Sequence, residues 1–347
     1  MSSYVGRKAQ DADYGMGEHS FDADSLGLID DKELTQRLLK TFGAPNYQPP
    51  RLPAVAMELM SLARNPDVEF DAIERLLEQD AMLTGEILAI ARSSAYAGRG
   101  EVAGIRQALV RLGLKKLSEV VMAAAMNMRV FRSKAYQDWM ERLRKHSLST
   151  AHICRFVSRY TAIDEEQAFL CGLLHDVGIA GIFLVLGDTK GKNELDLNVL
   201  WPAIHAAHTQ AGAEMVKRWK LPPEMAMVVG AHHHVLIDGH DHPMAATVCI
   251  AEALSLEFDR GLMPSDDKEE LPEDGDVVVV DHECDLGQIS GMTGKLDTGA
   301  IDRTNPNILE RAKHAIGIND ALMALIRDDA MAWLQAEDEA AAADKSR

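Results

Sequence analysis

From residue 52 onward, apolar residues recur with helical spacing and short turns separate the stripes. This period predicts amphipathic helices that bury their apolar faces against one another. The expected helical segments cover residues 52–62, 73–77, 81–94, 105–112, 117–130, 244–256 and 308–339, and Gly113 is expected to act as a hinge between two of them. Many helices with short connections indicate an all-α fold, a multi-helix bundle.

The same pattern divides the chain into successive parts. Residues 1–40 are expected to form a flexible acidic arm, because the first 30 residues are rich in Ser, Gly and Asp without a sustained period. A helical domain follows at 45–258, with an N-terminal part at 52–130 and a second part at 136–258. Residues 259–290 are expected to be an acidic loop or linker, and residues 300–340 to be C-terminal helices that pack on the bundle. Within the acidic loop, the stretch 276–281 has strand composition but is too short to assign.

Composition narrows the class of protein. The chain has 347 residues, of which 47% are hydrophobic, and a net charge of -18 from 54 acidic and 36 basic side chains. This balance excludes a broadly basic surface, so we expect no direct nucleic-acid binding. The chain has no signal-peptide-like start and no uninterrupted run of eighteen apolar residues, so we expect no membrane segment and a cytoplasmic location. The four Cys contain no CxxC pair, and three of them are expected to be small core residues.

The charge is distributed unevenly along the chain. Residues 257–285 contain 12 acidic and two basic side chains, whereas residues 92–145 contain 12 basic and four acidic ones. The ordinary explanation of the basic stretch is a set of solvated helix faces. The functional alternative is a site for an anion, either a phosphorylated small ligand or the acidic surface of a signalling protein. Its candidate residues are Arg92, Arg111, Lys115, Lys116 and Arg142.

Histidines gather in the second helical part. Ten of the 13 lie between His146 and His242. His175 and Asp176 are adjacent at the end of an apolar helix, where an unpaired carboxylate beside an imidazole is costly. A divalent metal would compensate both groups, although a hydrogen bond between His and Asp would also do so without a metal.

Other segments supply further ligand types. His146, His208 in the frame His208-x-x-x-Gly212, and the pair His232 and His233 offer nitrogen donors. Imidazole and carboxylate ligands suit Zn, Mn or Fe, and two ions about 3.5–4 Å apart could clamp a phosphodiester. Glu252 is the only charged residue of its helix, so a metal is one candidate partner. A solvated edge shared with Thr247 or Ser255 is the ordinary interpretation of Glu252, and we place His205, His234, His240 and His242 at the surface or in loops.

Eight short motifs follow one another along the two helical parts. They are Leu-Pro-Ala-Val at 52–55, Gln-Asp-Ala-Met-Leu-Thr at 79–84, Ala-Arg-Ser-Ser-Ala-Tyr at 91–96, Ile-Arg-Gln-Ala-Leu at 105–109, Leu-Gly-Leu-Lys-Lys-Leu at 112–117, His-Ser-Leu at 146–148, Gly-Leu-Leu-His-Asp-Val-Gly at 172–178 and Trp-Lys-Leu-Pro at 219–222. In this order the motifs resemble the HDOD family, the HD-related output domains of bacterial signalling. The resemblance covers roughly residues 50–258.

The resemblance implies an HD-like helical bundle and a regulatory module that acts by protein or nucleotide binding. It also implies kinship with metal-dependent HD phosphohydrolases and HD-GYP phosphodiesterases, so phosphoester hydrolysis is the alternative function.

The ligand positions of the HD pattern correspond to His146, His175, Asp176, His208, His232 and His233. The chain departs from that pattern at Arg142, which stands where HD-GYP enzymes carry an acidic ligand. Glu252 replaces the usual terminal Asp, and the Gly-Tyr-Pro motif is missing, which argues against cyclic-dinucleotide hydrolysis. A third alternative is a scaffold in which the His and Asp side chains only hydrogen-bond in the core.

Overall fold

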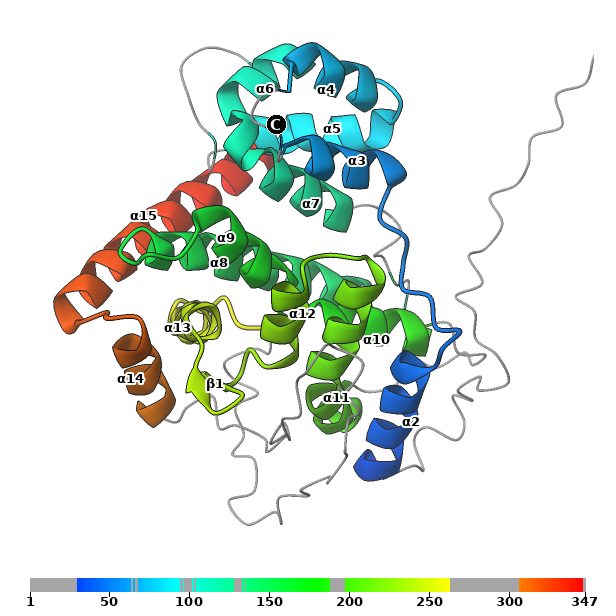
Figure 1. Cartoon of the computed structure of the whole chain (residues 1–347), viewed down its shortest axis with the longest axis vertical. Helices are drawn as coiled ribbons and strands as arrows, with labels where there is room; N and C mark the ends of the chain where they lie inside the picture. The colour runs from blue at the N-terminus through cyan, green and yellow to red at the C-terminus, as the bar shows by residue number, and fades with distance from the viewer. Residues whose placement is uncertain are drawn as a thin grey trace, which may run out of the picture.

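The computed structural model is built almost wholly from helices, which confirms the all-α prediction (Figure 1). It describes residues 30–262 and 306–345, apart from 64, 66–67, 94–95, 97–101, 103, 128–132, 134 and 188–196. The elements in this part of the chain are α2 (Asp31–Gly43), α3 (Ala54–Ala63), α4 (Phe70–Leu77), α5 (Ala81–Arg92), α6 (Ile105–Leu112), the 3-10 helix η2 (Leu114–Lys116), α7 (Leu117–Asn127), α8 (Gln137–Ser158), α9 (Glu165–Leu174), α10 (Val177–Gly187), α11 (Leu197–Arg218), α12 (Pro223–Gly230), β1 (Leu236–Ile237), β2 (His240–Asp241), α13 (Pro243–Glu257), α14 (Pro306–Ala315) and α15 (Asp320–Lys345).

Helix α2 lies where the sequence predicted the last part of a flexible arm. Its apolar residues are spaced by one helical turn and are buried, namely Leu34, Leu38 and Phe42. The Asp30 carboxylate caps its first turn, and the helix packs on α11. The prediction of a flexible arm is therefore wrong for residues 31–40, because a cap and a buried stripe fix them as helix. Residues 1–29 lie outside the described part of the chain.

Helices α3 to α7 form a first layer, at the top of Figure 1. Within it, α3 and α5 pack on α7, and α4 packs on α6. Gly113 joins α6 to η2 with φ +71°, a backbone conformation that favours glycine, at the bend that the sequence predicted. Helix α7 is buried along most of its length and contacts α8 and α9. It is therefore the main link between the first layer and the rest of the molecule.

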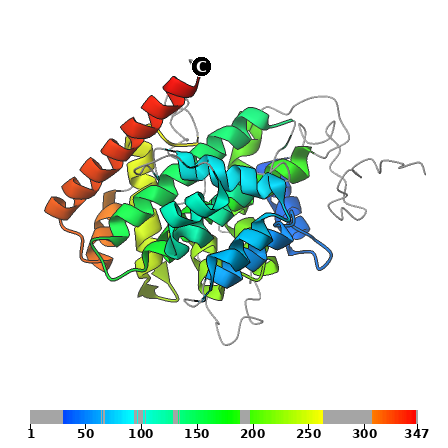
Figure 2. The same cartoon turned by 90° about the horizontal axis from the view of Figure 1, so that it is seen from above.

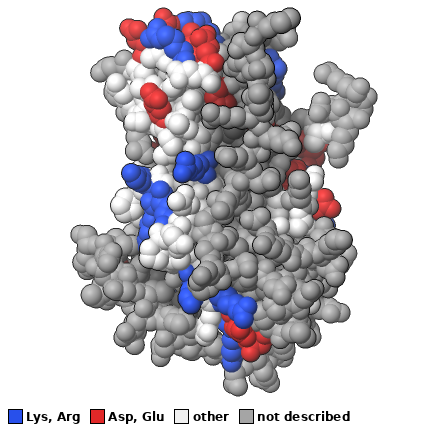
Figure 3. Space-filling view, turned by 90° about the vertical axis from the view of Figure 1, so that its right-hand side faces the viewer, with Lys and Arg blue, Asp and Glu red and all other residues white. Residues whose placement is uncertain are grey.

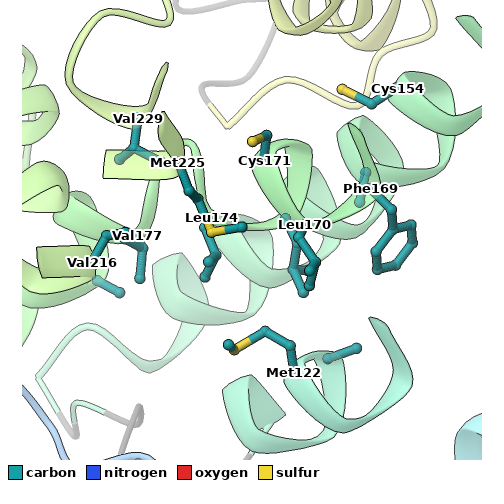
Figure 4. Close-up of a cluster of buried hydrophobic side chains, with 14 of the residues drawn as sticks. Met122, Cys154, Phe169, Leu170, Cys171, Leu174, Val177, Val216, Met225 and Val229 are labelled. Carbon is teal, nitrogen blue, oxygen red and sulfur yellow. The ribbon is translucent and has the colours of Figure 1, made fainter. Parts of the chain in front are cut away.

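Helices α8 to α13 form the second layer. Its centre is the stretch from Glu165 to Gly187, which contains α9 and α10 and is apolar and long enough to cross a membrane by composition. The most apolar window of this stretch is completely buried inside the bundle, so it serves as the protein core. Figure 4 shows side chains of α7, α9 and α12 meeting around Leu170 and Leu174. This apolar core lies directly beside the His-Asp pair at 175–176.

The last two helices cover one flank of the second layer. Helix α14 packs on α13, and α15 packs on α8 and runs along the side of the bundle (Figures 1 and 2). A small antiparallel hairpin pairs β1 with β2 through a turn at Asp238 and Gly239, which both have positive φ. The predicted acidic loop, including the stretch 276–281, lies outside the described residues from 263 onward.

Candidate metal centre

Seven polar side chains from separate elements of the second layer meet inside the protein. They come from α8, the α9–α10 junction, α11, the turn after α12, and α13. They are His146, His175, Asp176, His208, His232, His233 and Glu252. All are buried, with exposed fractions between 0% and 9%. The structure thus brings together the seven residues that the sequence named as candidate ligands.

Two glycines let α10 and α11 approach closely enough to join the His-Asp pair to His208. A Cβ on Gly178 would overlap the backbone carbonyl of His208 and lie 2.6 Å from the backbone nitrogen of Gly212. A Cβ on Gly212 would in turn lie 2.8 Å from a side-chain carbon of Val229 in α12. The glycines that follow both ligand segments in the sequence are therefore needed for close backbone packing.

Three of the imidazole rings are fixed by the same local contact. In each, Nδ1 faces the backbone carbonyl three residues earlier. The pairs are His175 with Gly172 at 2.7 Å, His208 with His205 at 2.6 Å, and His232 with Val229 at 2.8 Å. Because a carbonyl oxygen only accepts, each ring donates from Nδ1 and its Nε2 atom carries a lone pair. The lone pairs of all three rings point toward Asp176.

The ring of His146 has the same arrangement, with Nδ1 donating and Nε2 free, but its partner lies far away in the sequence. Its Nδ1 atom donates to the backbone carbonyl of Arg260, 2.9 Å away, just after the end of α13. The guanidinium of Arg260 in turn pairs with Asp338 of α15 at 2.5 Å. Arg260 cannot be identified from the sequence, because it acts through its backbone carbonyl, which every residue has, and its side chain pairs elsewhere.

Asp176 lies at the centre of the cluster. Its Oδ2 atom is 3.3 Å from Nε2 of His175 and 3.5 Å from Nε2 of His146. Its Oδ1 atom is 3.4 Å from Nε2 of both His208 and His232. Neither oxygen has a hydrogen-bond partner among the described residues. Lone pairs of nitrogen and oxygen therefore face one another in a buried space, an arrangement that needs a cation or added protons to be stable.

The donor separations fit a bound metal. A zinc-like ion binds imidazole at about 2.1 Å, so two ligands at 90–110° lie about 3.0–3.4 Å apart. The Nε2 atoms are 3.1 Å apart between His146 and His175, 3.4 Å between His208 and His232, and 3.0 Å between His208 and His233. The donors form two groups, one of His146, His175, Asp176 and Glu252 and one of His208, His232 and His233. Each group could hold one ion, with Asp176 facing both.

Glu252 belongs to this buried cluster. It is only 6% exposed, and its Oε2 atom lies 3.3 Å from Nδ1 of His233. Helix α13 packs against α8 on one side and α14 on another, so the helix has no solvated edge at this position. The interpretation of Glu252 as a residue on a solvated edge is therefore wrong. The carboxylate faces imidazoles instead of water.

The ionisation of the cluster follows from burial and from the neighbouring charges. Burial opposes the ionised form of Asp176, but His175 and the other imidazoles hold its pKa well below the usual value. Burial also opposes a proton on His175, yet Asp176 raises the pKa of this ring above its usual value. Burial, together with His232 and His233, holds the pKa of His208 well below normal. These directions favour an ionised Asp176 and a neutral His208, which are the forms that bind a metal.

The remaining histidines of the block lie outside the two donor groups. His205 supports the site indirectly, because its carbonyl fixes the ring of His208. His242 caps α13 by accepting the backbone N–H of Ala245 at 3.3 Å. His234 is half-buried and His240 is exposed in the hairpin.

The basic residues named as an anion site are engaged locally. Arg92 donates to the carbonyl of Val102, Arg111 to the carbonyl of Ala91, Lys116 lies over the ring of Tyr96, and Arg142 lies over the ring of Trp139. The side chain of Lys115 is not described. On the face drawn in Figure 3, Lys and Arg stand in small separate groups, several beside acidic side chains. Anion binding by these residues stays a prediction.

Known proteins share this fold. A structure from Shewanella amazonensis, to which metal-dependent phosphohydrolase activity is ascribed, superposes with a TM-score of 0.54 at 21% identity, over 65% of this chain and 84% of that one. An HDOD domain protein of unknown function from Geobacter sulfurreducens gives a TM-score of 0.51 at 21% identity, over 86% and 97%. These likenesses establish a common fold.

Sequence relatives cover less of their own length. An uncharacterised protein of Treponema pallidum is 24% identical over 226 residues, which is 62% of this chain and 43% of the relative. Ribonuclease Y of Campylobacter hominis is 32% identical over 113 residues, 32% of this chain and 17% of that enzyme. The chain therefore spans less than half the length of these curated relatives.

The match to a family model is more extensive. Residues 50–235, more than half of the chain, match the model of the HDOD domain. The match includes the first layer, helices α8 to α12 of the second layer and six of the seven clustered residues. It ends before Glu252 and Arg260. The chain belongs to the HDOD domain family.

Proposed function

We propose that this HDOD chain is a regulatory module of bacterial signal transduction that carries a metal centre and acts by binding. The observation behind the proposal is the convergence of four imidazole lone pairs on the two oxygens of Asp176. Nitrogen and carboxylate donors suit Zn, Mn or Fe. A bound divalent ion would supply the missing positive charge and tie α8, the α9–α10 junction, α11 and α13 to one point. The proposed partners are signalling proteins or a phosphorylated small ligand.

Burial of the donors supports binding over turnover. Structural metal sites are closed, whereas catalytic sites keep a position open for water or substrate. His175, Asp176, His208 and His232 are all 0% exposed, and Glu252 is 6% exposed. A phosphoester would have to displace protein to reach ions held by these groups.

Element analysis of the purified chain tests the metal centre. We expect one or two ions per chain in the wild type and less than a tenth of that in the His175→Ala, Asp176→Ala double variant. His240→Ala is the matched control, since this exposed histidine lies outside the donor groups. Chelation should also lower the melting temperature of the wild type and of His240→Ala. Equal, substoichiometric metal in all three proteins would contradict the proposal.

Phosphoester hydrolysis is the second candidate. It is favoured by the position of Asp176 between two donor groups and by the stretch similar to ribonuclease Y. The assay is hydrolysis of bis(p-nitrophenyl) phosphate and of cyclic dinucleotides with added Mn²⁺ or Fe²⁺. Product formation that disappears in Asp176→Asn would replace the binding proposal with an enzymatic one. Absence of turnover with a fully loaded centre would support binding.

The partner can be sought with the chain itself. A pull-down with the intact chain should recover a partner that is lost on deletion of the acidic residues 263–285, which leaves Arg260 in place, or on changing Lys115 and Lys116 to Glu. Attraction between charged surfaces weakens with salt, so recovery should fall as salt rises. Recovery that is independent of salt and of both changes would argue against a charge-based interface.

A further inference from the structure

A cavity of about 230 Å³ lies between the two layers, away from the donor groups. Helices α5 and α7 line it from the first layer, and α8, α9, α10 and α15 line it from the second. Its wall includes Ser147, Leu173 and Val177, which neighbour the ligands His146, His175 and Asp176 in sequence. The cavity and the metal centre thus use different faces of the same helices.

Aromatic side chains that contact one another line part of the cavity. The ring of His152 stacks on Trp333 of α15, with ring centroids 4.1 Å apart and planes at 20°. Phe169 meets His152 edge-on at 5.2 Å, and Tyr96 does so at 6.3 Å. Such a wall suits a flat aromatic guest, because ring stacking adds to the burial of apolar area.

His152 adds hydrogen-bonding atoms to this aromatic wall. Its side chain is 2% exposed and packs against three aromatic rings, and no hydrogen bond joins its ring nitrogens to another described residue. Burial, with the charges of Lys116 and Arg159, lowers the pKa of His152 to about 3. The neutral ring offers one donor and one acceptor. The indole nitrogen of Trp333, in the same wall, also has no hydrogen-bond partner among the described residues.

Size and charge limit the guest further. A cavity of ~150 Å³ holds a benzene ring, so about 230 Å³ has room for two fused rings. The charged lining residues are Glu86, Glu337 and Arg144, and Arg144 is already paired with Glu141 at 2.6 Å. Two carboxylates and one compensated guanidinium disfavour an anionic guest such as a nucleotide.

We propose that this cavity binds an uncharged bicyclic heteroaromatic ring that carries both a hydrogen-bond acceptor and a donor, such as a purine base. The aromatic wall of His152, Phe169 and Trp333 holds the ring, and His152 provides the hydrogen bonds. The guest bridges α5 and α7 to α8 and α15, so binding fixes the two layers relative to each other. This site is independent of the metal centre and needs no ion.

Calorimetric titration of the full chain with adenine, indole and AMP tests the proposal. Indole matches adenine in size but has no ring-nitrogen acceptor, and AMP adds a phosphate. We expect one adenine per chain, bound at least tenfold more tightly than indole or AMP. His152→Phe should weaken adenine at least tenfold and indole by less, because it keeps the ring and removes both polar atoms, of which indole can use only the acceptor.

A second variant, at an exposed position, tests the proposal even where His152→Phe fails to fold. Ala89 lines the cavity from an exposed position on α5, so Ala89→Phe should block adenine without disturbing the core. Val110→Phe is the matched control, since Val110 is 66% exposed on α6 and lies outside the cavity. No adenine binding at millimolar concentration, equal binding of adenine and indole, tighter binding of AMP, or unchanged adenine binding in Ala89→Phe would each overturn the proposal.

Discussion

Gly178 lies directly against the backbone carbonyl of His208, with no room for a methyl group between α10 and α11. Asp176, two residues earlier, consequently comes within 3.4 Å of the His208 ring. The close approach of α10 and α11 at Gly178 therefore determines both the packing of the core and the spacing of the donor atoms.

We expect Gly178→Ala to destabilise the protein by at least about 3 kcal/mol, because the added methyl forces two backbones apart. The metal content of Gly178→Ala should fall together with its stability. Gly85→Ala is the matched control in α5, since an added Cβ there meets nothing within 4 Å. That variant should gain about 0.5–1 kcal/mol from its higher helix propensity. Chemical unfolding of both variants provides the measurement, and equal stabilities would refute the close crossing.

Acid should destabilise the protein partly through His152. Burial and nearby positive charges lower the pKa of this ring to about 3 in the folded protein. The ring therefore takes up a proton near pH 6.5 in the unfolded chain but stays neutral at that pH in the native state. Stability is thus complete above pH 6.5 and falls as the pH drops toward 3. Between pH 6.5 and 4.5 the loss from this ring is about 2 kcal/mol.

The variant His152→Phe isolates this contribution. Its free energy of unfolding should fall by about 2 kcal/mol less than that of the wild type over the same interval. Denaturant unfolding at the two pH values measures the difference. Parallel pH profiles in the two proteins would show that His152 is not buried in its neutral form.

A buried ion pair joins the two layers. Arg155 of α8 donates to the carboxylate of Glu119 in α7, and both side chains are at most 4% exposed. Removing one partner leaves an uncompensated buried charge, so Glu119→Ala should cost about 3–5 kcal/mol. The double variant Glu119→Leu, Arg155→Met should recover most of that loss, because apolar side chains can fill the same space. A double variant as unstable as Glu119→Ala would assign the effect to packing instead of charge.

Three cysteines should be inert in the folded protein. Cys154, Cys171 and Cys249 are buried as free thiols, and burial raises the pKa of Cys171 to about 12. The thiolate is the reactive form, so native protein at pH 8 should leave all three unlabelled by iodoacetamide. The measurement uses Cys284→Ser, which removes the remaining cysteine. Mass spectrometry should detect three labels only after denaturation, and fast native labelling would contradict the burial.

Helical spacing predicted much of the fold, since every expected helical segment that lies in the described part of the chain corresponds to helix. The stripe of Leu34, Leu38 and Phe42 does not stand out in the sequence, because an acidic, aperiodic stretch precedes it. The helix of Glu252, taken alone, favours a solvated edge for this carboxylate. Packing on both sides of α13, which removes that edge, is a tertiary property.

The candidate ligands followed from residue type, but their arrangement did not. The sequence named the histidines around Asp176 without showing that their Nδ1 atoms face carbonyls and leave Nε2 free. The carbonyl of Arg260 and the cavity between the layers have no local pattern at all. Both depend on segments more than 100 residues apart in the chain.

The contact between His146 and the Arg260 carbonyl also determines when, during synthesis of the chain, the buried cluster can be completed. The ribosome delivers His146, His175 and Asp176 long before Glu252 and Arg260, and 114 residues separate the two ends of that contact. A nascent chain that has reached residue 235 holds the matched family segment but lacks the last carboxylate and the carbonyl that orients His146. The cluster is therefore completed late in synthesis, so an arrested or truncated chain would display the family signature with an unfinished centre.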